Sequence, residues 1–349
     1  MLIVLTNNTR PIRERFGIGA TNNPELRQKL ITDLIQKKFI KCQIIFDSKM
    51  ISNDWIKNVH DPEYLQFLEN AYKNVCDVND EHWIDLSGGL VPNHFYKTKP
   101  NKLVPLYKLS GYYGSDVMSP IYEDTFQNSM ISAQQAYIAA EMVYNDNSTN
   151  IIYVLACSPG HHAKSKEYGG YCYINNAVVA GYRLIELGKK KVGILDIDTH
   201  AGNGTAELVH TNQKFQNKLC ACSIHCDPSV EFPSFDGFDD DYKNPNIKNI
   251  IMKPKSNIND YVQALNIACD YLKRHHIETL IIAFGADTYK DDPDTSPLAK
   301  LNIDVDDYCV MAKIIKAHFP EISIIITQEG GYNLDFVPEI VCSFLKNLF

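Results

Sequence analysis

Short apolar runs alternate with helical patterns along almost the whole chain, and this alternation restricts the fold more than any other feature. Runs rich in aliphatic and β-branched residues predict strands at 2–5, 42–46, 151–156, 192–196, 219–224, 279–284 and 322–327. Apolar positions at helical spacing predict helices near 25–37, 62–76, 124–144, 173–188, 258–274 and 304–318. Apolar strands separated by helices form a parallel sheet that helices cover on both faces. The expected fold class is therefore α/β.

The length of the chain, 349 residues, suits one large α/β domain or two ordinary ones. The sequence contains no repeat, no low-complexity tract and no linker rich in glycine and serine, which favours a single domain over 1–349. Two polar stretches, 76–125 and 226–258, are too long for simple connections. We expect them to be functional loops.

Charge and cysteine content narrow the possible partners. A net charge of −8 argues against a nucleic-acid-binding surface, which needs clustered basic residues. The sequence shows no signal peptide or long apolar span, so we expect a cytoplasmic protein with reduced thiols and no membrane partner. Cys220, Cys222 and Cys226 have no second pair at zinc-finger spacing. We interpret them as small core residues.

The segment 195–205, LDIDTHAGNGT, completes an apolar strand and carries three potential metal ligands. Side chains alternate along a strand, so Asp196, Asp198 and His200 are predicted to share one face of it. Two buried carboxylates beside an imidazole are costly unless a cation holds them, which favours a divalent metal. A simpler interpretation treats Asp198 and His200 as turn residues, since aspartate and glycine favour turns.

Three further polar groups follow predicted strands, namely SPGHH at 158–162, GAD at 285–287 and QEGGY at 328–332. Open α/β sheets bind their ligands at these carboxyl ends. Asp198, His200 and Asp287 together offer two carboxylates and one imidazole, which leaves a coordination position open for water or substrate, as catalytic zinc requires.

The same groups contain an acid–base pair and a hydrogen-bond donor. His161 and His162 supply a base beside such a water. Tyr332, which follows two glycines, can donate a hydrogen bond to a developing oxyanion. His275-His276 is interpreted as a surface helix end, because it follows a basic helical segment. His225 ends a strand at the same edge, and we do not assign it as a ligand.

In their order along the chain, these motifs resemble the zinc-dependent histone deacetylase and acetylpolyamine amidohydrolase superfamily. The matching segments are PGHHA at 159–163, GGYCYINNA at 169–177, LDIDTHAGNGT at 195–205, GAD at 285–287 and EGGYN at 329–333. The resemblance covers nearly the whole chain and implies the arginase-deacetylase fold. Arginases use an Asp-x-His-x-Asp order that helps to hold two manganese ions. The order Asp-x-Asp-x-His at 196–200 instead favours a single zinc ion.

The resemblance implies a role for each matching residue. It implies that the zinc ligands are Asp198, His200 and Asp287. It implies that the catalytic residues are His162 as general base, His161 as its electrostatic or acid partner, Tyr332 as the donor to the acetyl carbonyl, and Asp196 and Asn203 as the partners of His161 and His162. It implies that the substrate-binding residues are Gly170, through its carbonyl, and the aromatic channel walls Tyr171 and Phe232. A structural potassium ion is implied at Asp196, the Ser223 hydroxyl, and the carbonyls of Asp198, His200 and Ile224.

Two positions depart from the pattern of the resembled family. Ala201 stands where members usually carry a second histidine, so we expect altered local packing with metal binding intact. Met118 stands where bacterial acetylpolyamine members place an acidic residue that binds the polyamine. Asp116 or Glu231 is the candidate substitute. Without such an acid at the channel mouth, short acetylated diamines or acetyl-lysine are favoured over longer polyamines.

The segments HDPEYL at 60–65 and HCDP at 225–228 are similar to the acetylpolyamine branch, in which a long loop closes over the site of a neighbouring subunit. The segment 90–123 is predicted to play this part in a homodimer, although an ordinary surface loop is also compatible with it. The sequence thus predicts a zinc-dependent deacetylase of small cationic amines such as acetylputrescine or acetylcadaverine. An acetyl-lysine protein deacetylase and a catalytically silent ligand-binding homologue stay open as alternatives, as does ferrous iron in place of zinc.

Overall fold

The computed structural model describes residues 2–7, 22–39, 42–46, 54–101, 103–145 and 151–348. Their centre is an eight-stranded sheet in the order β2-β1-β3-β8-β7-β4-β5-β6, in which every neighbouring pair is parallel. The strands are β1 (Leu2–Thr6), β2 (Cys42–Phe46), β3 (Ile151–Val154), β4 (Val192–Asp196), β5 (Leu219–Cys226), β6 (Ile247–Met252), β7 (Thr279–Phe284) and β8 (Ser323–Gln328). The predicted parallel α/β sheet is confirmed, and all the strands end at one edge.

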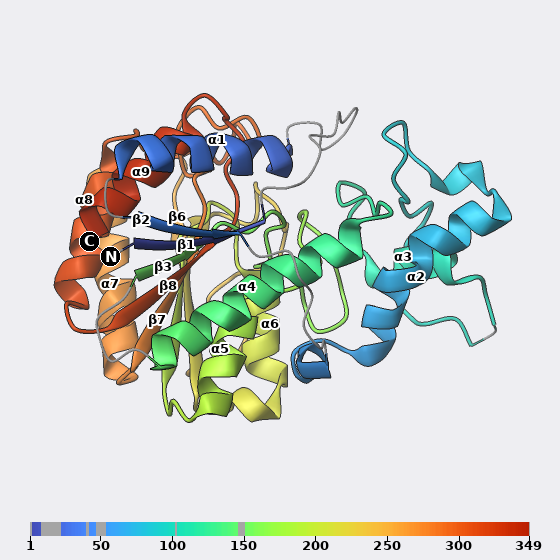
Figure 1. Cartoon of the computed structure of the whole chain (residues 1–349), viewed down its shortest axis with the longest axis horizontal. Helices are drawn as coiled ribbons and strands as arrows, with labels where there is room; N and C mark the ends of the chain where they lie inside the picture. The colour runs from blue at the N-terminus through green and yellow to red at the C-terminus, as the bar shows by residue number, and fades with distance from the viewer. Residues whose placement is uncertain are drawn as a thin grey trace.

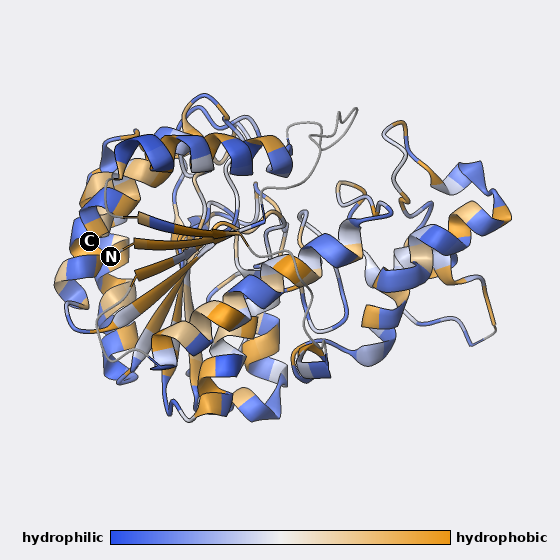
Figure 2. Ribbon diagram, viewed as in Figure 1, coloured by the Kyte–Doolittle hydropathy of each residue, from blue (hydrophilic) through white to orange (hydrophobic). Residues whose placement is uncertain are grey.

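Helices cover both faces of the sheet (Figure 1). One face carries α1 (Pro24–Lys38), α7 (Ile258–Arg274), α8 (Asp307–His318) and α9 (Val337–Leu348). The other carries α4 (Thr125–Asn145), α5 (Asn176–Leu187) and α6 (Asn203–Thr211). Strands β3, β4 and β7 are buried along their whole length. Figure 2 shows the matching hydropathy pattern: the central strands are apolar throughout, whereas most helices have a polar and an apolar side.

Apart from several short helical turns, three elements were absent from the sequence prediction. Strand β6 lies within 226–258, which we expected to be a loop, and that expectation was wrong. As an edge strand it is only half-buried, and its polar Lys248 and Asn249 interrupt the apolar run. Helix α6 begins at Asn203, inside a glycine-rich turn sequence that hides a helix start. Helix α9 was not predicted either.

The segment 54–123 extends from the carboxyl edge of the sheet, on the right of Figure 1. It contains the 3-10 helices η1 (Asp54–Asn58), η2 (Glu81–Trp83) and η3 (Leu106–Leu109) and the helices α2 (Pro62–Val78) and α3 (Ser110–Tyr113). The stretch that was expected to be a functional loop therefore carries short helices of its own.

The structure also shows where the three clustered cysteines lie and whether any described helix could cross a membrane. The thiols of Cys220, Cys222 and Cys226 are free and buried in β5, within the apolar core. This position matches their interpretation as core residues. In the described ranges, no helix combines the length and the apolar character that crossing a bilayer requires.

Candidate active site

Four neighbouring strands, β3, β8, β7 and β4, deliver polar residues to the same edge of the sheet. The loop after β3 carries His161 and His162, and the loop after β8 carries Tyr332. Asp287 follows β7, and Asp198 and His200 follow β4. The structure therefore brings together the groups that the sequence placed at strand ends.

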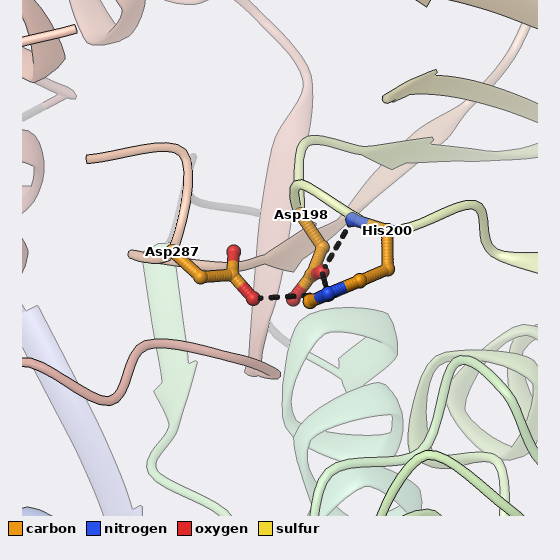
Figure 3. Close-up of side chains that lie close together, drawn as sticks. All are labelled: Asp198, His200 and Asp287. Atoms are coloured by element: carbon orange, nitrogen blue, oxygen red, sulfur yellow. Dashed lines mark hydrogen bonds and ion pairs between the residues drawn. The ribbon is translucent and has the colours of Figure 1, made fainter. Parts of the chain in front are cut away.

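Asp198, His200 and Asp287 form the centre of this site (Figure 3). His200 Nδ1 lies 3.1 Å from Asp198 Oδ1 and 3.3 Å from Asp287 Oδ2. Potential ligand atoms of the three side chains all lie within 4.8 Å of one another, and all three residues are buried. Within the described residues, this is the set of histidine, cysteine or acidic side chains that could hold a metal ion.

The reason we gave for this clustering was wrong in part. Strand β4 ends at Asp196, so Asp198 and His200 do not continue it but lie in the loop that precedes α6. Asp196 Oδ1 accepts a hydrogen bond from Asp198 N at 3.1 Å, and Asp198 Oδ1 accepts one from His200 N at 2.9 Å. Side-chain-to-backbone bonds, rather than strand alternation, fix these residues.

The surroundings of the two carboxylates fit a divalent cation. Asp287 Oδ2 is buried and accepts no hydrogen bond in the described structure, and its contact with a cationic group is the 3.3 Å approach of His200 Nδ1. Burial and the charge of Asp198 raise the pKa of Asp287. A Cβ atom at Gly330 would lie 1.9 Å from Asp287 Oδ2, so only glycine can pass here. Crowded carboxylates with an unmet acceptor are stabilised by a bound cation.

The two histidines of the pair have different partners. His161 Nδ1 lies 3.0 Å from Asp196 Oδ2, and His162 Nδ1 lies 2.8 Å from Asn203 Oδ1. Burial lowers the pKa of His161, but Asp198 and Asp196 outweigh it and raise this pKa to about 10. Burial and the neighbouring His161 hold the pKa of His162 well below its usual value. These opposite directions favour the charged form of His161 and the neutral form of His162, which are the forms that a proton donor and a base require.

A cavity of about 250 Å³ opens onto this site. Its lining residues are Met118, His162, Gly170, Tyr171, His200, Glu231, Phe232, Asp294, Ser296 and Tyr332. The Phe232 ring stands perpendicular to the His162 ring, with centroids 4.8 Å apart. The residues that the sequence proposed as channel walls therefore lie around one cavity.

Asp116, which we expected to bind substrate, does not line this cavity. Its Oδ2 accepts a hydrogen bond from Gly170 N at 2.7 Å, and its Oδ1 accepts bonds from Met118 N at 2.7 Å and Ser119 Oγ at 3.0 Å. The carboxylate braces the loop that carries Gly170. The expectation that Asp116 binds substrate was therefore wrong, because its carboxylate accepts backbone hydrogen bonds from Gly170 and Met118 instead.

Tyr332 lies against the cavity, with a side chain almost wholly buried. Asp292 Oδ2 accepts a hydrogen bond from Tyr332 N at 2.7 Å, and the Arg27 guanidinium stands 5.8 Å from the Tyr332 ring centroid. Burial raises the pKa of Tyr332 well above its ordinary value. The hydroxyl consequently keeps its proton and can donate it in a hydrogen bond.

His225 is a hydrogen-bonded core histidine. Its Nδ1 lies 2.7 Å from Ser223 Oγ, and its Nε2 lies 2.9 Å from the Gly237 carbonyl oxygen. Both ring nitrogens are therefore engaged. Ser223 lies opposite Asp196 in the register of β4 and β5.

Several residues of the site were not singled out by sequence reasoning. Glu329 Oε2 accepts hydrogen bonds from Gly160 N at 2.6 Å and His161 N at 3.1 Å, and so holds the backbone of the histidine pair. Asp294 lines the cavity. Glu329 lies inside the QEGGY motif at 328–332, which was the available signal, whereas Asp294 lies seven positions beyond the GAD motif at 285–287 and carried no such signal.

Comparisons with known proteins show which proteins the chain is similar to. The model of the histone deacetylase domain matches residues 21–348. Acetylpolyamine amidohydrolase 1 of Pseudomonas aeruginosa is 29% identical over 318 residues, which is 90% of this chain and 88% of that protein. The acetylpolyamine amidohydrolase of Mycoplana ramosa is 29% identical over 84% of this chain and 82% of its own length. The crystal structure of an acetylpolyamine aminohydrolase from Burkholderia pseudomallei superposes with a TM-score of 0.85 at 25% identity, covering 100% of this chain and 98% of that one.

Proposed function

The chain belongs to the histone deacetylase domain family and is a deacetylase, and from this premise we propose that it is a zinc-dependent amidohydrolase of small acetylated amines. The observation that carries the proposal is the position of the Asp198, His200 and Asp287 cluster beside a cavity that His162 and Tyr332 also line. We place the whole chain, 1–349, in one deacetylase domain.

In this proposal each side chain of the site has a separate role in hydrolysis of the amide. Asp198, His200 and Asp287 would hold the zinc ion, which polarises carbonyl groups and acidifies water when bound. His162 takes a proton from the water that attacks the amide carbon. Tyr332 donates a hydrogen bond to the carbonyl oxygen as negative charge develops there. Protonated His161 supplies the proton that lets the amine leave, so the amide and one water yield acetate and a free amine.

Charge around the cavity supports a cationic substrate. Among the residues that the structure describes, the lining contains two carboxylates, Asp294 and Glu231, and no lysine or arginine. Glu231 is committed to the backbone, because its oxygens accept hydrogen bonds from Ser296 N at 2.7 Å and Phe232 N at 2.9 Å. Asp294 Oδ1 accepts one from Tyr171 Oη at 3.1 Å. We therefore propose Asp294 as the acid that faces a distal ammonium group.

Asp294→Asn is expected to raise KM for acetylputrescine about tenfold, which corresponds to about 1.4 kcal/mol, with kcat nearly unchanged. The reason is the loss of one charge-assisted contact made equally in the ground and transition states. Steady-state kinetics with acetylputrescine and with the uncharged N-butylacetamide provide the measurement. A similar rise in KM for both substrates would show that Asp294 does not recognise the ammonium group.

We also propose that the segment 90–123 contacts a second copy of the chain. It exposes apolar side chains at Phe95, Leu103 and Val117, of which Leu103 is fully exposed. Exposed apolar side chains gathered on one segment are typical of interaction surfaces. Leu103→Asp is expected to convert a homodimer into a monomer in light scattering, and a monomeric wild-type protein would refute the proposal.

We propose a structural potassium ion at the carboxyl end of β4, beside β5. Asp196 and Ser223 lie side by side there in register, and both are buried. A buried carboxylate beside a hydroxyl oxygen offers the hard oxygen ligands that such a cation prefers.

The function is tested by incubating the zinc-loaded protein with acetylputrescine, acetylcadaverine, an acetylspermidine and an acetyl-lysine peptide, and measuring released acetate. Preference for the free amines would support the proposal. Preference for the peptide would favour a protein deacetylase. Bound zinc with no hydrolysis of any substrate would favour a catalytically silent homologue.

A further inference from the structure

We propose that Asp236 is a positioning residue, which orients the side-chain amide of Asn203 and thereby keeps the proton of His162 on Nδ1. Its effect on turnover rests on the proposed function. Its effect on the His162 proton does not, because the tautomer can be observed directly.

Asn203 bridges the base and the carboxylate. Its Oδ1 lies 2.8 Å from His162 Nδ1, and its Nδ2 donates to Asp236 Oδ2 at 3.1 Å. An ionised carboxylate only accepts hydrogen bonds, so the NH₂ end of the amide must face Asp236. The carbonyl end then faces His162.

This orientation determines the tautomer of the base. A neutral imidazole beside a carbonyl oxygen carries its proton on the nitrogen that faces that oxygen, here Nδ1. The other nitrogen, Nε2, keeps its lone pair and can accept a proton. An asparagine alone does not enforce this state, because a rotated amide would present NH₂ to Nδ1 and favour the opposite tautomer. Asp236 removes that freedom.

Asp236 itself is fixed by charge and by the backbone beside it. Lys164 Nζ lies 3.2 Å from Asp236 Oδ2 and 2.9 Å from Glu167 Oε1, so the carboxylate has a cationic partner. The following residue, Gly237, has φ +118°, and a Cβ atom there would lie 2.4 Å from Ala201 Cβ. The backbone after Asp236 can approach Ala201 so closely because position 237 is glycine.

The first test observes the tautomer. Metal-loaded protein labelled with ¹⁵N-histidine is compared by long-range nitrogen–proton correlation, and the His162 signal is assigned by its loss in His162→Asn. Wild type is expected to carry the proton on Nδ1. Asp236→Asn, whose new amide can both donate and accept, is expected to shift a measurable fraction to Nε2. An unchanged tautomer would overturn the proposal.

The matched control is Glu167→Gln, which removes the other partner of Lys164 without touching Asn203. It is expected to leave both the tautomer and turnover as in wild type, since Lys164 keeps Asp236. A tautomer shift in this variant as large as that in Asp236→Asn would overturn the specific role of Asp236.

The second test separates positioning from folding. Asp236→Asn is expected to lower kcat at least about tenfold with KM changed less than twofold. In an Asn203→Asp background, position 203 has no donor end to misplace, so adding Asp236→Asn should cost less than twofold. An equal loss of kcat in both backgrounds would reveal a structural role and overturn the proposal. Asp236→Ala repeats the comparison if the asparagine variant folds poorly.

The two proposals fail in different ways. A tautomer shift in Asp236→Asn, together with no hydrolysis of any acetylated amine by wild type, would support the positioning role and refute the proposed function. Hydrolysis by wild type with the tautomer and kcat unaffected in Asp236→Asn would do the reverse.

Discussion

Tyr332→Phe is expected to lower kcat by about 100- to 1000-fold, because removing one donor to a developing oxyanion costs about 2.7–4 kcal/mol. The side chain lines the cavity and keeps its proton, since burial raises the pKa of Tyr332 far above its ordinary value. Tyr332 is not one of the three residues that could hold the metal. Zinc content and KM are therefore expected to change little.

The measurement is the steady-state rate of acetate release from acetylputrescine, together with the zinc content of each variant. Tyr171→Phe is the matched control, because Tyr171 lines the same cavity and its hydroxyl donates to Asp294 at 3.1 Å. Its loss should affect KM for cationic substrates more than kcat. Turnover of Tyr332→Phe within a few fold of wild type would exclude the oxyanion role, and a loss of zinc would indicate a structural one.

The main architecture was predictable because strands that are buried on both faces have a recognisable sequence pattern. Strands β3, β4 and β7 are buried along their whole length, so their sequences are unbroken apolar runs. Strand β6, at the sheet edge, is half-buried and mixes Lys248 and Asn249 with its isoleucines. Its pattern therefore resembles a loop, and only its pairing with β5 makes it a strand.

The groups that form the centre of the site were predictable for a geometric reason. Parallel strands end at one edge, so polar residues after β3, β4, β7 and β8 must meet. The finer contacts were not predictable, because each joins distant segments. Asp236 meets Asn203 from 33 positions away, and Asp294 meets Tyr171 from 123 positions away. Neither pair follows a local period that a single sequence could reveal.

Specificity was the least predictable part for the same reason. The sequence shows Met118 and, two residues before it, Asp116. It does not show where the Met118 thioether or the Asp116 carboxylate points. In the fold, Asp116 accepts backbone hydrogen bonds from Gly170 and Met118, while Asp294 arrives from the loop beyond β7. An acidic group at the cavity is therefore supplied by a different segment.

Asp287→Asn is expected to abolish stoichiometric zinc binding and deacetylation while raising the melting temperature of the metal-free protein. Asparagine has the same shape, and its Oδ1 can still accept the hydrogen bond that Thr199 N donates to Asp287 Oδ1 at 3.0 Å. Its NH₂ group replaces Oδ2, a buried oxygen that accepts no hydrogen bond in the described structure, and the 3.3 Å ion-pair contact with His200 Nδ1 is the one interaction given up. The substitution thus removes a buried carboxylate beside Asp198, and with it a cost that the metal site imposes on folding.

Thermal unfolding with and without zinc distinguishes this site from a cluster of ordinary turn residues. At free zinc about 1,000-fold above its Kd, wild type should gain about 4 kcal/mol of stability, whereas Asp287→Asn should gain almost none. If the trio served only to hold its loops, the variant would instead be less stable than metal-free wild type, and zinc would stabilise neither protein. A metal-free variant more stable than wild type, yet unresponsive to zinc, is the signature of side chains held together for a cation at the expense of stability.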